Sequence, residues 1–136
     1  MARQFVIQLD NHPGELAHLA KAFAARGIDL RHVACVGAGS LACMFVTTSD
    51  DDAARRVLHG MGRLFIEGDP ILVEVEDRPG GLAEVTARLA EAGVNITGML
   101  TVGRRPGVVE MTLCVDDEVA AREALGMEIR DAVGVG

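Results

Sequence analysis

Two short loops carry the residues of this sequence that are best suited to hold a small charged molecule. Each follows an apolar run and leads into a helix-like segment, at residues 11–15 (NHPGE) and 77–81 (DRPGG). A helix N-terminus offers unpaired backbone N–H groups and the positive end of the helix dipole, so it suits a carboxylate. Glycine at Gly14 and at Gly80 and Gly81 allows a ligand to approach the backbone closely. Asn11 both donates and accepts hydrogen bonds, whereas ionised Asp77 only accepts and suits an ammonium group. Together these features favour a zwitterion.

The same residues also have an ordinary structural use. Asn and Asp cap helices in proteins of every kind, and Pro-Gly is common in turns. A single loop of this type would indicate only where a helix begins. We favour a binding site because the pattern occurs twice in the chain.

The chain is an internal duplication with an offset of 66 residues. Residues 9–17 align with 75–83, and the same offset pairs Gly27 with Gly93, residues 50–51 with 116–117, and residues 60–61 with 126–127. A single register over such a span indicates a tandem repeat. The repeat predicts two domains, residues 1–67 and 68–136.

Each copy predicts the order βαββαβ. Short apolar runs at 5–9 and 71–75 predict strands, and helices follow up to Gly27 and Gly93, which supply left-handed end residues. Hairpin strands are expected at 28–36 and 41–47, and at 94–102 and 108–113. Acidic runs from Asp50 and Asp116 predict second helices. Last strands are expected at 63–66 and 128–130, of which the second is short and weak. This is an α+β, ferredoxin-like fold, a four-stranded antiparallel sheet with both helices on one face. Units of about 65 residues have thin cores, so we expect a homodimer.

Composition excludes several classes of function. The net charge is −7, and the chain contains no Trp and no Tyr, so nucleic-acid binding is not expected. No apolar stretch approaches the ~20 residues of a membrane span, and the N-terminus lacks a signal-peptide core, so we expect a cytoplasmic protein. The adjacent Arg104 and Arg105 are expected at a solvated hairpin tip.

The cysteine and histidine spacings predict neither a disulfide nor a metal site. Three cysteines lie in apolar surroundings without CxxC spacing and are expected as buried, reduced thiols; they are Cys35, Cys43 and Cys114. Four histidines show no recurring ligand spacing, although His12 and His18 are neighbours. Zinc needs three or four convergent ligands, so the sequence predicts no metal and no cofactor.

The two motifs resemble the ACT domain, a small regulatory module. The resemblance rests on residues 11–17 (NHPGELA) followed by 27–30 (GIDL), repeated as 77–83 (DRPGGLA) and 93–96 (GVNI). It covers essentially the whole chain and implies a protein that binds an amino acid and regulates an enzyme. It further implies that the ligand lies between two units, against the first loop of one and the start of the second strand of the other. The implied ligand-binding residues are Asn11, His12, Gly14, Glu15, Leu16, Asp29, Leu30, Asp77, Arg78, Gly80, Gly81, Leu82, Asn95 and Ile96.

Two pairings of these half-sites remain open. Pairing within the chain would set Asn11 opposite Asn95 and Asp77 opposite Asp29. The first pair suits a zwitterion, whereas the second crowds two acids that would repel a carboxylate or pair with Arg78. The Asn11 site would then be the tighter one. Pairing of like units between chains would instead set Asn11 opposite Asp29 and Asp77 opposite Asn95.

Two other functions compete with amino-acid binding. The fold could serve as a ligand-free interaction module, a regulatory subunit of a metabolic enzyme that binds through the edge of its second strand. A small acyl-phosphate hydrolase could use Arg78 and Asn95. The loop, however, lacks a glycine-rich phosphate cradle, and no catalytic set recurs between the copies. We therefore expect no enzymatic activity.

Overall fold

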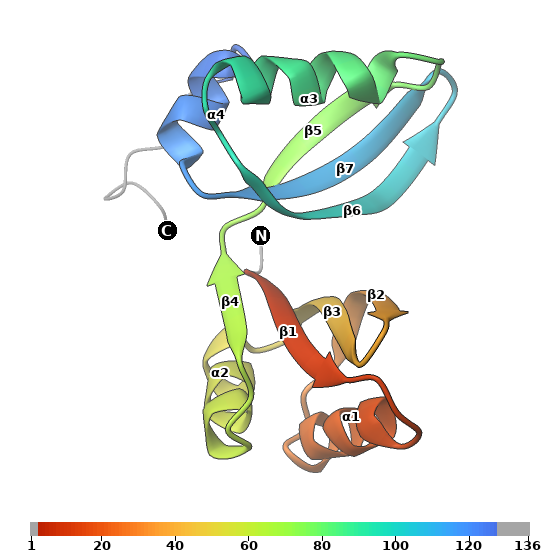
Figure 1. Cartoon of the computed structure of the whole chain (residues 1–136), viewed down its shortest axis with the longest axis vertical. Helices are drawn as coiled ribbons and strands as arrows, with labels where there is room; N and C mark the ends of the chain where they lie inside the picture. The colour runs from red at the N-terminus through yellow and green to blue at the C-terminus, as the bar shows by residue number, and fades with distance from the viewer. Residues whose placement is uncertain (1–2, 128–136) are drawn as a thin grey trace. The chain divides into compact units, whose positions relative to one another are not determined.

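The computed structural model describes residues 3–127 (Figure 1). In its N-terminal part, strands with alternating apolar residues form an antiparallel sheet. Contacts divide the chain into two units, Met1–Pro70 and Ile71–Gly136. The elements of the first are β1 (Gln4–Asp10), α1 (Glu15–Ala25), β2 (Leu30–Ala38), β3 (Leu41–Thr48), α2 (Asp51–Gly60) and β4 (Phe65–Gly68). The strand order is β2-β3-β1-β4. The β1–α1 loop therefore leaves a central strand of the sheet.

The core of the first unit lies between its sheet and its two helices. Every second residue of β1 is buried, and the buried side chains meet those of Leu19 and Phe23 from α1 and of Leu58 from α2. Both helices lie on the same face of the sheet (Figure 1). This packing holds the N-terminus of α1 beside the C-terminal end of β1.

The second unit repeats this arrangement over the described residues. Its elements are β5 (Ile71–Glu76), α3 (Gly81–Glu91), β6 (Ile96–Arg105), β7 (Val108–Val115) and α4 (Glu118–Ala124). The strand order is β5-β7-β6, and the helices again share one face (Figure 1). The last strand expected at 128–130 lies outside the described residues. The predicted α+β fold, with antiparallel sheets covered on one face, is confirmed.

The repeat register shifts by one residue inside the second strand of the second unit. The β6–β7 pairing contains a register shift between Thr101 and Gly103, whereas β2 pairs with β3 without interruption from Val33 to its end. The helices that follow are capped by Asp50 and Asp117, which are 67 residues apart. The uninterrupted 66-residue register predicted from the sequence is therefore wrong beyond this point, because a bulge in β6 absorbs one extra residue.

Two of the three cysteines are exposed, contrary to the prediction of buried thiols. Cys114 is buried, but Cys35 and Cys43 are accessible to solvent. Cys43 alternates with the buried Ala42 and Met44, so its side chain points to the sheet face that the helices leave open. Cys35 lies on β2, an edge strand. Among the described residues, no helix is long and apolar enough to cross a membrane.

Candidate functional site

The N-termini of α1 and α3 have the same backbone geometry and no side-chain cap. Gly14 and Gly80 take the N-cap position with φ 88° and 90°, in the left-handed region that favours glycine. By contrast, Asp50 and Asp117 cap α2 and α4, each accepting a backbone N–H at 3.0 Å. The first N–H of each helix is bonded within its own loop, from Glu15 to His12 O at 3.4 Å and from Gly81 to Arg78 O at 3.0 Å. The N–H groups that follow in each first turn face the loop without a competing carboxylate cap.

Asn11 fastens its loop to the β2–β3 hairpin instead of capping α1. Its Nδ2 donates to the carbonyl oxygen of Gly39 at 3.0 Å, and its backbone N–H donates to Ser40 O at 2.9 Å. The side chain lies against Gly37, where an added Cβ would stand 2.7 Å from Asn11 Oδ1. Glycine at this position therefore leaves room for the amide. The alternative interpretation of Asn11 as a helix cap is wrong.

In the second unit, Asp77 connects its loop to the β6–β7 hairpin through an ion pair. Its backbone N–H donates to Gly107 O at 3.0 Å, and its carboxylate accepts from Arg104 Nη1 at 3.1 Å. Within the unit, Asp77 pairs with Arg104 and not with Arg78, and Asp77 does not cap α3. Arg104 and Arg105 are exposed as expected, but they end β6 and are ion-paired, Arg105 with Glu74.

Arg78 is instead held between two glutamates beside the N-terminus of α3. Its guanidinium pairs with Glu76 and with Glu84, the latter at 2.7 Å, and also donates to Pro79 O at 3.2 Å. The Arg78 hydrogen bond holds the pKa of the Glu84 carboxyl below its usual range. Gly81, the first residue of α3, is buried against β5, where an added Cβ would lie 2.1 Å from Glu76 O. The side chain of Leu82 is exposed.

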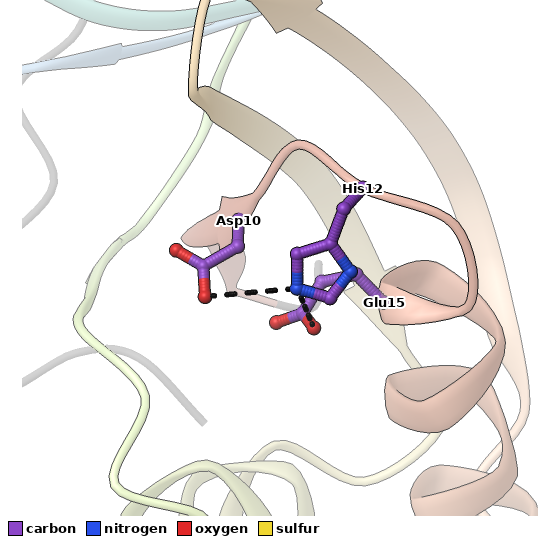
Figure 2. Close-up of side chains that lie close together, drawn as sticks. All are labelled: Asp10, His12 and Glu15. Atoms are coloured by element: carbon purple, nitrogen blue, oxygen red, sulfur yellow. Dashed lines mark ion pairs between the residues drawn. The ribbon is translucent and has the colours of Figure 1, made fainter.

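The loop of the first unit carries a different set of charges. Glu15 is largely covered and pairs with Arg63, while its Oε2 lies 3.5 Å from His12 Nε2 (Figure 2). The hydrogen bond from Arg63 is the main cause of a Glu15 pKa below its usual value. Arg63 could not be predicted as a partner of Glu15, because it is 48 residues away along the chain and lies in no recognisable motif. Leu16 is exposed at the start of α1.

The second group of candidate residues lies at the other end of each sheet. Asp29 and Ser49 are joined by hydrogen bonds of 2.8 and 3.0 Å, and Asn95 and Asp116 by bonds of 2.9 and 3.1 Å. The side chains of Asp29 and Asn95 are exposed, and the neighbouring Leu30 and Ile96 are half-buried.

Each unit therefore separates its two half-sites. The strand β1 lies between them in the first unit, and its seven residues span about 20 Å at ~3.3 Å per residue. Arg78 and Asn95 are separated in the same way within the second unit. The arrangement of a single unit therefore does not support an acyl-phosphate hydrolase activity.

A further hollow, not expected from the sequence, lies on the first unit. It has a volume of about 300 Å³ and is lined by Val6, Gln8, Cys43, Leu64, Phe65 and Ile66. Val6 and Gln8 alternate with the buried Phe5 and Ile7, so they point away from the helices. That alternation is the signal in the sequence from which an open sheet face could have been predicted.

Comparisons with known proteins agree with this fold. Residues 71–132 match the family model of the ACT domain. A protein of known structure from Bacteroides thetaiotaomicron superimposes with a TM-score of 0.68 at 23% identity, covering 92% of this chain and 86% of its own. The ligand-free regulatory subunit of aspartate kinase from Thermus thermophilus gives 0.58 at 22% identity, covering 92% and 89%. The corresponding subunit from Thermus flavus gives 0.59 at 22%, covering 93% and 92%. No curated protein matches the chain in sequence. The chain thus contains one ACT domain identified by its sequence, residues 71–132.

Proposed function

We propose that this chain is an amino-acid-binding regulatory protein made of two ACT domains in tandem, residues 1–67 and 68–136. The observation that carries the proposal is the pair of helix N-termini at Gly14 and Gly80. Both have left-handed glycine caps, φ 88° and 90°, and neither has a side-chain cap. The ACT match over residues 71–132 supports the assignment of the second domain, and the shared fold supports that of the first.

The carboxylate of the ligand would bind the first turn of α1 or α3. The backbone N–H groups and the positive end of the helix dipole favour an anion there. At Gly14 an added Cβ would meet no atom within 4 Å, whereas at Gly80 it would lie 3.4 Å from Arg78 Nη1. Leu16 and Leu82 are 43% and 40% exposed beside these turns. They offer apolar contact to the aliphatic part of an amino acid, whereas His12 and Arg78 offer polar contact.

The start of the second strand in a neighbouring unit would complete each site. Each unit holds its own two half-sites at opposite ends of its sheet, so a ligand that touches both groups requires two units. The Asn11 amide donates one Nδ2 hydrogen to Gly39 O and keeps its other donor and its neutral acceptor, Oδ1, for a ligand, whereas the charge of Asp77 is already paired with Arg104. We therefore expect two inequivalent sites, of which the Asn11 site is the tighter.

Regulation would follow if ligand binding changed how the protein associates with itself or with an enzyme. The aspartate kinase subunits from two Thermus species are regulatory proteins of comparable length, and their fold extends over more than nine tenths of this chain. We propose a homodimer that regulates a metabolic enzyme in the same manner, without catalytic activity of its own.

A panel of the twenty amino acids in a thermal-unfolding assay tests the proposal. A ligand at 100 times its dissociation constant stabilises the fold by about 2.7 kcal/mol, which corresponds to roughly 5–11 °C at about 2–4 °C per kcal/mol. We expect one or a few amino acids to give such a shift and their decarboxylated analogues to give none. A flat panel, together with no amino acid in natively purified protein, would contradict the proposal.

Matched variants distinguish the two pairings of half-sites. Asn11→Ala should reduce the ligand-induced shift more than Asp77→Ala, each measured against the variant's own melting temperature without ligand. If the units pair within the chain, Asn95→Ala should reproduce the effect of Asn11→Ala. If like units pair between chains, Asn95→Ala should instead resemble Asp77→Ala.

The edge of β2 supports one competing function, a ligand-free interaction module. Strand β2 ends the first sheet, and its side chains Val33 and Val36 are 46% and 63% exposed. An unpaired strand edge with apolar side chains is suited to pairing with another chain. The flat amino-acid panel described above is the result that would favour this function.

A further inference from the structure

Three side chains of the first loop gather their ligand atoms around one point. His12 Nε2 lies 3.5 Å from Glu15 Oε2 and 3.9 Å from Asp10 Oδ2, and all three ligand atoms lie within 4.8 Å of one another. In Figure 2 both ion pairs converge on the same ring nitrogen, with the two carboxylates directed toward it. Two atoms bound to one tetrahedral zinc ion at about 2.1 Å lie about 3.4 Å apart. Small rotations of the exposed His12 and Asp10 side chains would therefore bring the three atoms to coordination distance.

The hydrogen bond at the other ring nitrogen orients His12 for coordination. Nδ1 lies 3.1 Å from the carbonyl oxygen of Pro13. A carbonyl oxygen only accepts, so Nδ1 carries the hydrogen, and in neutral imidazole Nε2 carries the lone pair. That lone pair would face two carboxylates, which is unfavourable unless a proton or a metal ion lies between them. Metal-binding histidines characteristically donate their second N–H to a carbonyl or a carboxylate in this way.

Glu15 is also held in place by a group outside the cluster. Arg63 pairs with Oε1 and leaves Oε2 facing His12. The Glu15 side chain is only 13% exposed, so its carboxylate is far less free to move than that of Asp10, which is 69% exposed. Two of the three prospective ligands therefore already have the supporting hydrogen bonds that protein metal sites use.

The second unit lacks this arrangement. The positions equivalent to Asp10, His12 and Glu15 are Glu76, Arg78 and Gly81. Arg78 places a cation where the imidazole would be, and the glycine supplies no ligand. The repeat thus conserves the backbone of the loop but provides the three ligands only once.

We propose that Asp10, His12 and Glu15 bind one divalent transition-metal ion of the zinc class. One imidazole and two carboxylates form a donor set that suits zinc. Three protein ligands leave at least one coordination position for water or for a small molecule. The site shares His12 and Glu15 with the proposed amino-acid site, but zinc binding can be measured without an amino acid.

Zinc titration of the full chain, with a fluorescent zinc indicator as competitor, tests this proposal. The titration should use a Cys35→Ser/Cys43→Ser background, because exposed thiols bind zinc themselves. We expect one zinc ion per chain. Loss of supporting hydrogen bonds alone weakens metal sites by about 10–100-fold. We therefore expect His12→Ala and Asp10→Asn, both at exposed positions, to weaken binding by at least that factor. His59→Ala removes an exposed imidazole on α2 and should leave the affinity unchanged.

A second measurement does not depend on any variant. Nitrogen-15 NMR of the histidine rings should show zinc perturbing Nε2 of His12 more than any other ring nitrogen. No binding, binding that survives His12→Ala, or a larger change at His18, His32 or His59 would each overturn the proposal.

Discussion

Gly81→Ala should destabilise the second unit although it places a better helix former in α3. An added Cβ would lie 2.1 Å from the carbonyl oxygen of Glu76, about 1.3 Å inside the 3.4 Å at which ordinary contact begins. Relief requires the first turn of α3 to move away from β5, because the obstructing atom is backbone. Overpacking of this kind costs about 1–3 kcal/mol, whereas helix propensity alone would stabilise by up to ~1 kcal/mol. The two effects have opposite signs.

Calorimetry of the full chain measures the result. For a unit of this size, a cost of about 2 kcal/mol lowers the melting temperature by about 8–16 °C, at ~4–8 °C per kcal/mol. Gly60→Ala is the matched control, since this glycine lies in α2 with no atom within 4 Å of an added Cβ and no left-handed φ. It should be neutral or slightly stabilising. A Gly81→Ala variant as stable as the original protein would refute the close approach of α3 to β5.

Three other expectations concern the folded protein as a whole. The pKa of Glu67 is held below its usual value of 4.5, mainly by its hydrogen bonds with Arg55. The pair's contribution to the free energy of unfolding is therefore complete above pH 4.5 and is lost as the pH falls through the lower folded-state pKa. Glu67→Gln should make the free energy of unfolding depend less on pH in this range, and an unchanged pH dependence would contradict this. In native protein Cys35 and Cys43 should react rapidly with a thiol reagent and Cys114 only on unfolding, and a single fast thiol would be inconsistent with their exposure. Sedimentation equilibrium at micromolar concentration should give a dimer, and a clean monomer would count against the proposed assembly.

The fold could be predicted because its local signals are strong and occur twice. Apolar runs gave the strands, and the glycines at the helix ends adopt the left-handed backbone that the pattern requires, with φ 68° at Gly27 and 71° at Gly93. The extra residue in β6 could not be located in this way. A bulge changes only the hydrogen-bond register between two strands. The apolar and polar residues on either side of it still alternate as in a regular strand, so the sequence does not mark its position.

Burial of the cysteines was predictable in part from the same alternation. Ala42 and Met44 are buried beside the exposed Cys43, so a strict period of two would have placed this thiol on the open face of the sheet. The prediction of a buried thiol rested on the residue type and not on the position of Cys43 in the alternating pattern. Cys35 is a different case, because its exposure depends on β2 being an edge strand, which topology decides.

The candidate loops could be predicted, but the charges within them could not. Residue types and spacing predict the two helix N-termini, whose backbones are nearly identical. The partner of Glu15 is 48 residues distant along the chain, and that of Asp77 is 27 residues distant. These pairs depend on which strands become neighbours and on the length of each hairpin. Local patterns therefore predict where a ligand could bind, and long-range pairing determines which charges remain available to it.

The difference between the two loops leads to a last prediction, for Arg78→His in the second unit. The substitution would place an imidazole two residues after Glu76, at the spacing that separates Asp10 from His12. The same variant carries Glu84→Gln, because Glu84 pairs with Arg78 at 2.7 Å and would otherwise supply a third carboxylate. The equivalent of Glu15 would then be missing, because Gly81 has no side chain and an added Cβ there would meet Glu76 O at 2.1 Å. Zinc sites need three or four ligands, so the number of zinc ions bound per chain should not rise. A second bound ion in the zinc titration would show that one carboxylate and one imidazole suffice, and that Glu15 is dispensable at the equivalent position of the first unit.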